Sequence, residues 1–86
     1  MRTILIIHEV DDVDHWLDSP RRREIFGPLG ITARTFVDPD QPNRVGLLVE
    51  VPSMEVYREA IESPGAAAAL EYDGVRPGTV RVLIES

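Results

Sequence analysis

The chain has 86 residues and no cysteine. This absence excludes disulfides, thiolate zinc sites and cysteine nucleophiles. A chain of this length buries only about 60% of the surface that it exposes when unfolded, so its core alone gives marginal stability. Association with a second subunit is then the expected supplement, and the lack of cysteine fits a reducing compartment.

Basic residues are also scarce, with nine Lys and Arg against fifteen Asp and Glu, and a formal net charge of -6. This charge repels a phosphate backbone, which Lys and Arg must neutralise, so we expect no nucleic-acid partner. The apolar run at residues 4–7 is far too short for a membrane span or a signal-peptide core, and acidic residues follow it. We therefore expect a cytoplasmic protein with no membrane partner.

Known catalytic signatures are missing as well. The sequence contains no glycine-rich phosphate loop and no Ser-His-Asp order, so nothing supports kinase-like or hydrolase chemistry. No cofactor is expected.

The residues that are present alternate as strands in four stretches, residues 3–10, 31–37, 44–51 and 79–85. A dense turn signal at residues 38–43 predicts a β-hairpin between the second and third stretches. Helical spacing lies between the strands of each half, and each helical segment is interrupted once, at Ser19-Pro20 or at Ser63-Pro64. The pattern predicts one domain over residues 1–86, a ferredoxin-like α+β fold of order βαββαβ with a four-stranded antiparallel sheet and helices on one face.

The second face of this sheet predicts a homodimer. A sheet with water on one side alternates apolar and polar residues, but Leu5, Ile7 and Leu48 lie opposite residues that already form a core face. Two sheets packed face to face would cover them.

Several residues resemble a known family. They are His8 to Asp12 followed by Trp16, the hairpin at 38–43 leading into Val45, and the later Ser63-Pro64 and Gly74-Val75. The chain is similar to small bacterial dimeric α+β barrel proteins, the cyclase-like or antibiotic biosynthesis monooxygenase-like group. The resemblance implies the same fold and a homodimer. It also implies relatives that include cyclases, cofactor-independent monooxygenases, isomerases and ligand-sensing domains.

His8 is the candidate catalytic residue, because its parity with Ile4 and Ile6 directs it to the same layer of the fold. An imidazole that titrates near pH 6.5 can act as a general base or donate a hydrogen bond to an oxyanion. The alternative is a structural histidine bonded to a carbonyl or an acid, and both interpretations are open. A metal site formed by His8, Asp11, Asp12 and His15 matches no known ligand spacing, and helix capping explains the aspartates better.

Trp16, Tyr57, Arg34 and Arg81 are the candidate ligand-binding residues. Trp16 and Tyr57 lie on the apolar sides of the predicted helices, where they either pack in the core or form the walls of a cleft for flat apolar ligands. Arg34 and Arg81 lie on strands and would act inside the cleft or across the dimer interface. The run Arg21 to Arg23 is expected to be a solvated helix face.

Three functions agree with these residues. The first is a cyclase or cofactor-independent monooxygenase that acts on an aromatic or polyketide-like small molecule, with His8 as the acid-base group. The second is a non-catalytic module that binds or senses a small hydrophobic or aromatic ligand in the same cleft. The third is a structural dimer whose cleft is filled by side chains. Whether the cleft beside His8 is open distinguishes the third from the others.

Overall fold

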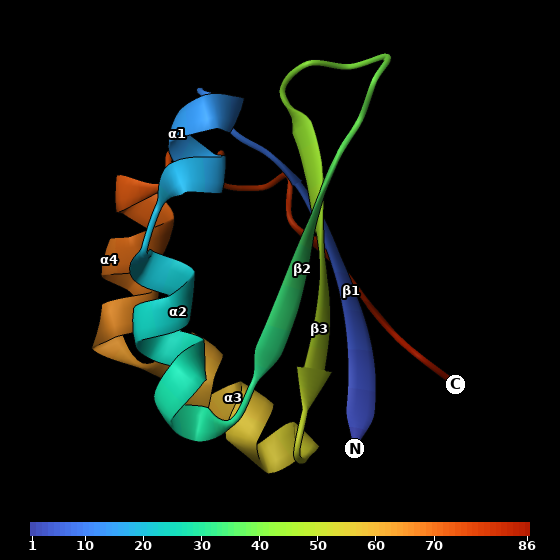
Figure 1. Ribbon diagram of the computed structural model, residues 1–86, viewed down its shortest axis with the longest axis vertical. Coiled ribbons are helices and arrows are strands. Elements are labelled where there is room, and N and C mark those ends of the chain that lie inside the picture. Colours follow the sequence, from blue (N-terminus) through green and yellow to red (C-terminus); the bar gives the residue numbers. More distant parts are fainter.

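A layer of helices covers one face of a four-stranded sheet in the computed structural model, which describes residues 1–86 (Figure 1). The elements in chain order are β1 (Arg2–Glu9), α1 (Val13–Asp18), α2 (Arg21–Phe26), the 3-10 helix η1 (Gly27–Leu29), β2 (Thr32–Val37), β3 (Arg44–Val51), α3 (Met54–Glu62), α4 (Pro64–Tyr72) and β4 (Arg81–Ile84). No helix combines the length and the apolar composition needed to cross a membrane.

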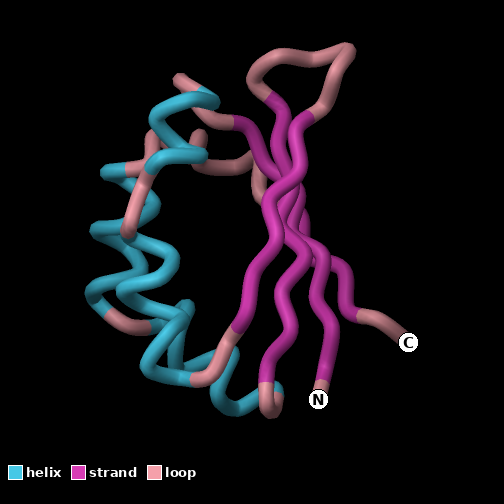
Figure 2. Tube along the Cα trace, in the orientation of Figure 1, coloured by secondary structure: helices cyan, strands magenta, loops and turns pink.

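The strands lie in the order β2-β3-β1-β4, and every neighbouring pair is antiparallel (Figure 2). This strand order and the observed succession of strands and helical segments, βαββαβ, confirm the predicted ferredoxin-like α+β fold. The last strand is shorter than expected and begins at Arg81 instead of Thr79. The Thr79 hydroxyl instead accepts a hydrogen bond from the Glu9 amide at 3.1 Å and donates one to the Arg76 carbonyl at 2.7 Å, which holds the chain in a turn.

Both predicted helix breaks are confirmed. Ser63 caps α4 by accepting a hydrogen bond from the Ala66 amide at 3.2 Å, and Pro64 occupies the first helical turn, where its missing N–H costs nothing. Ser19 separates α1 from α2 and accepts a hydrogen bond from the Arg21 amide at 3.2 Å. The breaks turn each helical segment so that it follows the curved face of the sheet.

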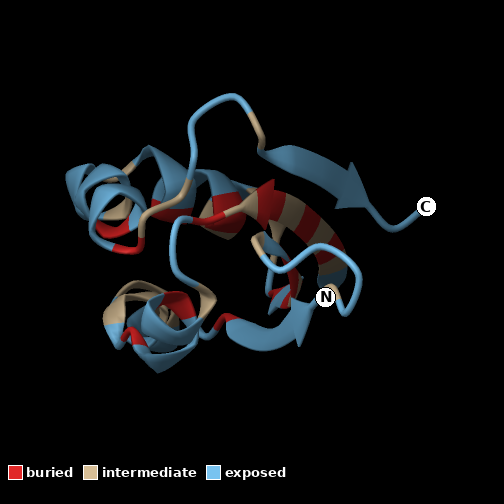
Figure 3. Ribbon diagram, turned by 90° about the horizontal axis from the view of Figure 1, so that it is seen from above, coloured by how far each residue is buried: buried red, intermediate tan, exposed pale blue.

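The core lies between the helices and the two central strands, β1 and β3 (Figure 3). Burial alternates along β1, where every second side chain faces the helices. The edge strands β2 and β4 are exposed along their whole length. The buried apolar side chains of this core are Ile4, Ile6, Val10, Trp16, Ile31, Val45, Leu47, Val49, Val51, Tyr57 and Ala60.

The outer face of the sheet, away from the helices, is apolar in its centre. Leu5 pairs with Leu48 on β3 and with Leu83 on β4, and strand partners of this kind point to the same face. Ile7 and Phe36 extend the patch, and both Phe36 and Leu83 are about half exposed. We call these five side chains the outer patch.

Gly46 belongs to the outer patch side and not to the helix side, because it pairs with Ile7 and Phe36. A Cβ atom at this position would lie 3.8 Å from the Cβ of Phe36. A methyl group would therefore fit beside Phe36 in ordinary contact, and a larger side chain would extend the outer patch.

Candidate functional site

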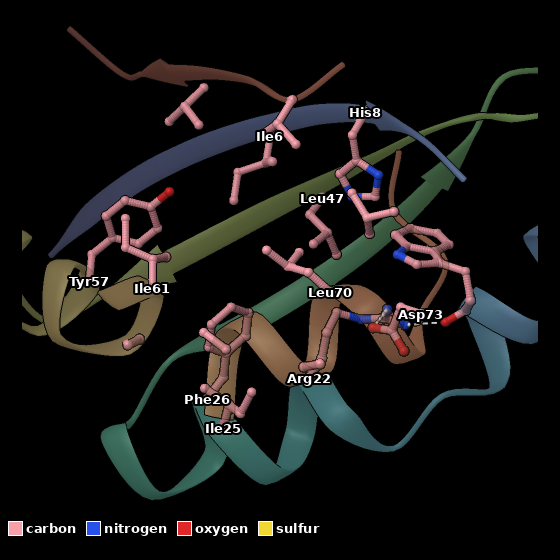
Figure 4. Close-up of a pocket in the computed structure, with 17 residues that line it drawn as sticks. Ile6, His8, Arg22, Ile25, Phe26, Leu47, Tyr57, Ile61, Leu70 and Asp73 are labelled. Atoms are coloured by element: carbon pink, nitrogen blue, oxygen red, sulfur yellow. Dashed lines mark hydrogen bonds and ion pairs between the residues drawn. The ribbon is translucent and has the colours of Figure 1, made fainter. Parts of the chain in front are cut away.

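A cavity of about 220 Å³ lies between the helices and the sheet, and His8 faces it (Figure 4). The cleft is therefore open, which does not agree with a structural dimer whose cleft is filled by side chains. Its wall is apolar except for three polar residues, His8, Arg22 and Asp73. The apolar wall consists of Ile6, Trp16, Ile25, Phe26, Leu47, Tyr57, Ala60, Ile61, Ala66, Ala69, Leu70, Val75, Val80 and Val82.

The cavity opens between β4 and the two C-terminal helices. Ile61 on α3, Leu70 on α4 and Val82 on β4 all contribute to its wall, yet each is 44 to 49% exposed. No helix covers β4 on this side. The rim of the cavity at this edge is therefore exposed to solvent.

His8 is placed by the parity of β1, next to Ile6 on the face that the helices cover, as expected. Only 4% of its surface is exposed, its ring meets Trp16 edge to face at 5.6 Å between centroids, and its Nδ1 has no hydrogen-bond partner in the chain. Burial, and then the charge of Arg22, lower the pKa of His8 below 6.5. The imidazole is therefore neutral at neutral pH and free to accept a proton.

Arg22 reaches the same end of the cavity from α2. Its guanidinium lies 4.5 Å from the centre of the Trp16 ring, and its Nη2 donates a hydrogen bond to the Trp16 carbonyl at 3.0 Å. Its Nη1 is 4.0 Å from Oδ2 of Asp73 and has no hydrogen-bond partner in the chain. The cation is thus held on one side by Trp16, and on the other side it faces Asp73 without a hydrogen bond.

The expectation that the arginine run is a solvated face is wrong for Arg22. Arg21 does lie at the surface, where it pairs with Glu24 at 2.8 Å, but the Arg22 side chain is only 14% exposed. The helical spacing contained the signal, because Arg22 precedes Ile25 and Phe26 by three and four residues and so shares their face. The run was nevertheless expected to face water, because all three of its residues are charged.

Asp73 is the third polar residue of the wall and was not among the expected site residues. It ends α4, is 5% exposed, and its Oδ1 has no hydrogen-bond partner in the chain. A carboxylate at the C-terminus of a helix faces the negative end of the helix dipole, so this position is unfavourable for packing alone. Its sequence signal was weak, since Asp73 also belongs to the Asp-Gly turn that ends the helix.

Trp16 and Tyr57 are buried in the core and also line the cavity, so both of the roles considered for them agree with the structure. Figure 4 shows Tyr57 at the opposite end of the cavity from His8. Burial raises the pKa of the Tyr57 phenol, which keeps its hydroxyl protonated. Contact of either ring with a ligand remains a prediction.

Arg34 and Arg81 do not line this cavity. Arg34 pairs with Leu48, and Arg81 pairs with Ile7, so strand parity puts both arginines on the outer face of the sheet. A position inside the cleft is therefore incorrect for them. Their other proposed position, across a dimer interface, agrees with their place beside the outer patch.

The histidines and aspartates considered for a metal site have separate partners. Asp12 caps α1 by accepting a hydrogen bond from the His15 amide at 3.1 Å, and Asp11 pairs with Arg76 at 2.9 Å. Nε2 of His15 lies 2.8 Å from the carbonyl oxygen of Tyr72, the last residue of α4. His8 faces the cavity instead, and no three acidic or histidine side chains gather where they could hold an ion.

Comparisons with known proteins show the fold. No family model matches the sequence, and no curated protein matches it. A crystal structure of an antibiotic biosynthesis monooxygenase superimposes with a TM-score of 0.69 at 12% identity, covering 100% of this chain and 97% of that chain. A provisionally named antibiotic biosynthesis monooxygenase from Nitrosomonas europaea gives 0.68 at 10% identity, covering 99% and 88%.

A protein from Mycobacterium tuberculosis gives a TM-score of 0.62 at 13% identity, covering 100% of this chain and 94% of that chain. At these identities the likeness concerns the backbone alone. It confirms the expected resemblance at the level of architecture: the chain has the same fold as the antibiotic biosynthesis monooxygenase structures.

Proposed function

We propose that the cavity binds a flat, largely apolar small molecule and that His8 removes a proton from it, the step that a cyclase and a cofactor-independent monooxygenase share. One observation carries this proposal. Three buried polar atoms without partners, Nδ1 of His8, Nη1 of Arg22 and Oδ1 of Asp73, belong to one end of an otherwise apolar cavity. Buried polar atoms are nearly always hydrogen-bonded, so their concentration here is best explained by a ligand that supplies the partners.

The cavity dimensions limit the ligand. An engineered apolar cavity of about 150 Å³ binds benzene. About 220 Å³ therefore accommodates one to two rings, and a longer molecule would extend through the opening beside β4. The apolar wall favours an aromatic or polyketide-like body, whose polar edge would lie at His8.

The proton step follows from the state of His8. Because its pKa is lowered, His8 is in the neutral form that a general base requires at neutral pH, and in our proposal its ring nitrogen takes a proton from an acidic C–H beside a carbonyl group of the ligand. The electron pair of that bond stays on the ligand as an enolate, and the imidazolium that forms on His8 balances its charge. Carbon–carbon bond formation or attack on dioxygen would both start from such a carbanion.

Proton exchange tests the proposal without knowledge of the natural substrate. The bicyclic ketone 2-tetralone carries acidic C–H bonds, and the exchange of these hydrogens in D₂O can be followed by NMR. We expect the protein to accelerate exchange. In His8→Gln the catalysed exchange rate should fall about a hundredfold or more. His15→Gln, which changes the exposed second histidine, is the matched control and should exchange like the unmodified protein.

Saturable binding of 2-tetralone without accelerated exchange would overturn the enzymatic proposal in favour of a binding or sensing module. Equal exchange by His8→Gln and the unmodified protein would show that another group is the base.

We also propose that two copies pair through the outer patch. The patch lies on both central strands and is bordered by Arg34 and Arg81. The resemblance to dimeric barrels supports this pairing, as does the marginal core of a chain of 86 residues. The cavity lies on the other face of the sheet, so each copy would keep its own site.

A further inference from the structure

We infer that Arg22 and Asp73 together form a specificity element that holds a hydroxyl group of the ligand and rejects a carboxylate. The inference rests on the proposed function, because it names the class of ligand for the same cavity. It concerns the anchoring of the ligand, whereas the proton step belongs to His8.

The first argument is the geometry of the pair. Nη1 of Arg22 and Oδ2 of Asp73 are 4.0 Å apart, beyond the reach of a hydrogen bond. The cation cannot simply swing away, since its Nη2 is bonded to the Trp16 carbonyl and its guanidinium lies over the Trp16 ring. The backbone of Asp73 is held as the C-cap of α4, and its side chain is buried. The donor Nη1 of Arg22 and the acceptor Oδ2 of Asp73 therefore face each other without a hydrogen bond between them.

The second argument is the chemistry that fills such a gap. A guanidinium only donates hydrogen bonds and an ionised carboxylate only accepts them. A hydroxyl oxygen does both, so one O–H placed between them can accept from Nη1 of Arg22 and donate to Oδ2 of Asp73. Two such hydrogen bonds meeting at one oxygen span about 4 to 4.6 Å, close to the observed separation. The unpaired atoms are covered by the surrounding side chains, so the hydroxyl would enter by parting a pair that is not yet hydrogen-bonded.

The third argument is charge. With His8 neutral, the charges of Arg22 and Asp73 balance, so the polar end of the cavity has no excess cation for an anionic ligand. A ligand carboxylate would meet the buried carboxylate of Asp73, whose position at the C-terminus of α4 adds further negative potential. Like charges at short range are costly where water is excluded. A neutral hydroxyl is therefore preferred.

Calorimetric titration with three naphthalene probes tests this selection at pH 7.5. The probes are 2-naphthol, 2-methoxynaphthalene, which accepts but does not donate, and 2-naphthoate, which is anionic. We expect the unmodified protein to bind 2-naphthol at least tenfold more tightly than either of the others. In Asp73→Asn, which keeps the shape of the side chain and removes its charge, we expect binding of 2-naphthoate to become at least tenfold tighter.

The control is Glu71→Gln, which removes an exposed charge two residues away on the same helix and should leave all three affinities within twofold. Circular dichroism of each variant confirms that it is folded. If Asp73→Asn does not fold, Arg22→Met serves in its place, and it should weaken the binding of 2-naphthol at least tenfold, because the ligand oxygen loses the donor that holds it.

The outcomes separate the two proposals. Equal affinities for the three probes, or no gain of 2-naphthoate binding in Asp73→Asn, would overturn the inference while leaving a ligand-binding cavity. Failure of every probe to bind would overturn the proposed function and the inference with it.

Discussion

The two faces of the sheet use the same strands for different purposes. On the helix face, β1 presents Ile4, Ile6 and His8 to a core that contains a cavity. On the outer face, the same strand presents Leu5 and Ile7 to a surface that nothing in the chain covers. One face therefore has polar atoms without partners inside an apolar wall, and the other has apolar side chains without cover.

This difference indicates which partner each face needs. Unpaired buried polar atoms are satisfied by a small molecule with polar groups of its own. An apolar surface on a sheet is removed from water when it packs against another apolar surface of similar shape, such as that of a second copy of the chain. The following predictions test this division, beginning with the largest expected effect.

Removal of the Trp16 ring should damage the helix face most. Trp16 is 1% exposed, and it also supports Arg22 and contacts His8. We expect Trp16→Ala to lower the free energy of unfolding by about 3 to 5 kcal/mol, measured by urea denaturation. Leu17→Ala is the neighbouring control and should cost less than about 1 kcal/mol, because Leu17 is 40% exposed. Similar losses in both variants would contradict the assignment of the core.

A charge in the outer patch should break the proposed dimer. Leu48→Glu would place a carboxylate in the centre of an apolar interface, so we expect the dimer dissociation constant to rise about a hundredfold or more in sedimentation experiments. The helix face should keep its ligand affinity. Glu50→Gln, on the same face of β3, is the control. A monomeric unmodified protein at micromolar concentration would contradict this part of the account.

The buried histidine should make stability depend on pH. The pKa of His8 is lowered in the folded chain, whereas the unfolded chain keeps a value near 6.5. As the pH falls below 6.5, the unfolded chain therefore binds a proton that the folded chain does not, which favours unfolding. Relative to His8→Gln, the unmodified protein should lose up to about 1.4 kcal/mol per pH unit in this range and nothing above it. Parallel pH profiles of thermal unfolding for the two proteins would contradict this.

The smallest effect is expected from the arginines of the outer face. Arg34→Ala and Arg81→Ala should change the affinity for 2-naphthol by less than twofold, because both side chains lie on the opposite side of the sheet from the cavity. Calorimetry with Arg22→Met as the positive control measures this. A large loss in Arg34→Ala would mean that ligands bind on the outer face.

The fold was predictable because its signals are local and agree with each other. Alternation along β1 and β3, the turn at residues 38–43 and the Ser-Pro breaks each determine a short segment, and together they permit few topologies. The direction of His8 followed from parity alone. The start of β4 was missed because Thr79 forms a side-chain hydrogen bond instead of a strand pair.

The site was only partly predictable, because it depends on which side of an element a charged residue takes. Strand parity on its own does not state which face the helices cover, and so the sequence left Arg34 and Arg81 either inside the cleft or across a dimer interface, whereas their strand partners put them on the outer face. Arg22 was overlooked because a run of arginines usually faces water, although its helical phase matched Ile25. The cavity itself arises from side chains of seven separate elements, and no single-segment pattern encodes it.

Methyl NMR of leucine-labelled protein during titration with 2-naphthol tests the division between the faces most directly. Leu47 and Leu48 are neighbours in the sequence, but Leu47 lines the cavity and Leu48 lies in the outer patch. We predict saturable shifts of the methyl signals of Leu47 and Leu70, with those of Leu5 and Leu48 unchanged. Shifts confined to Leu5 and Leu48, or no saturable shift at all, would contradict the account.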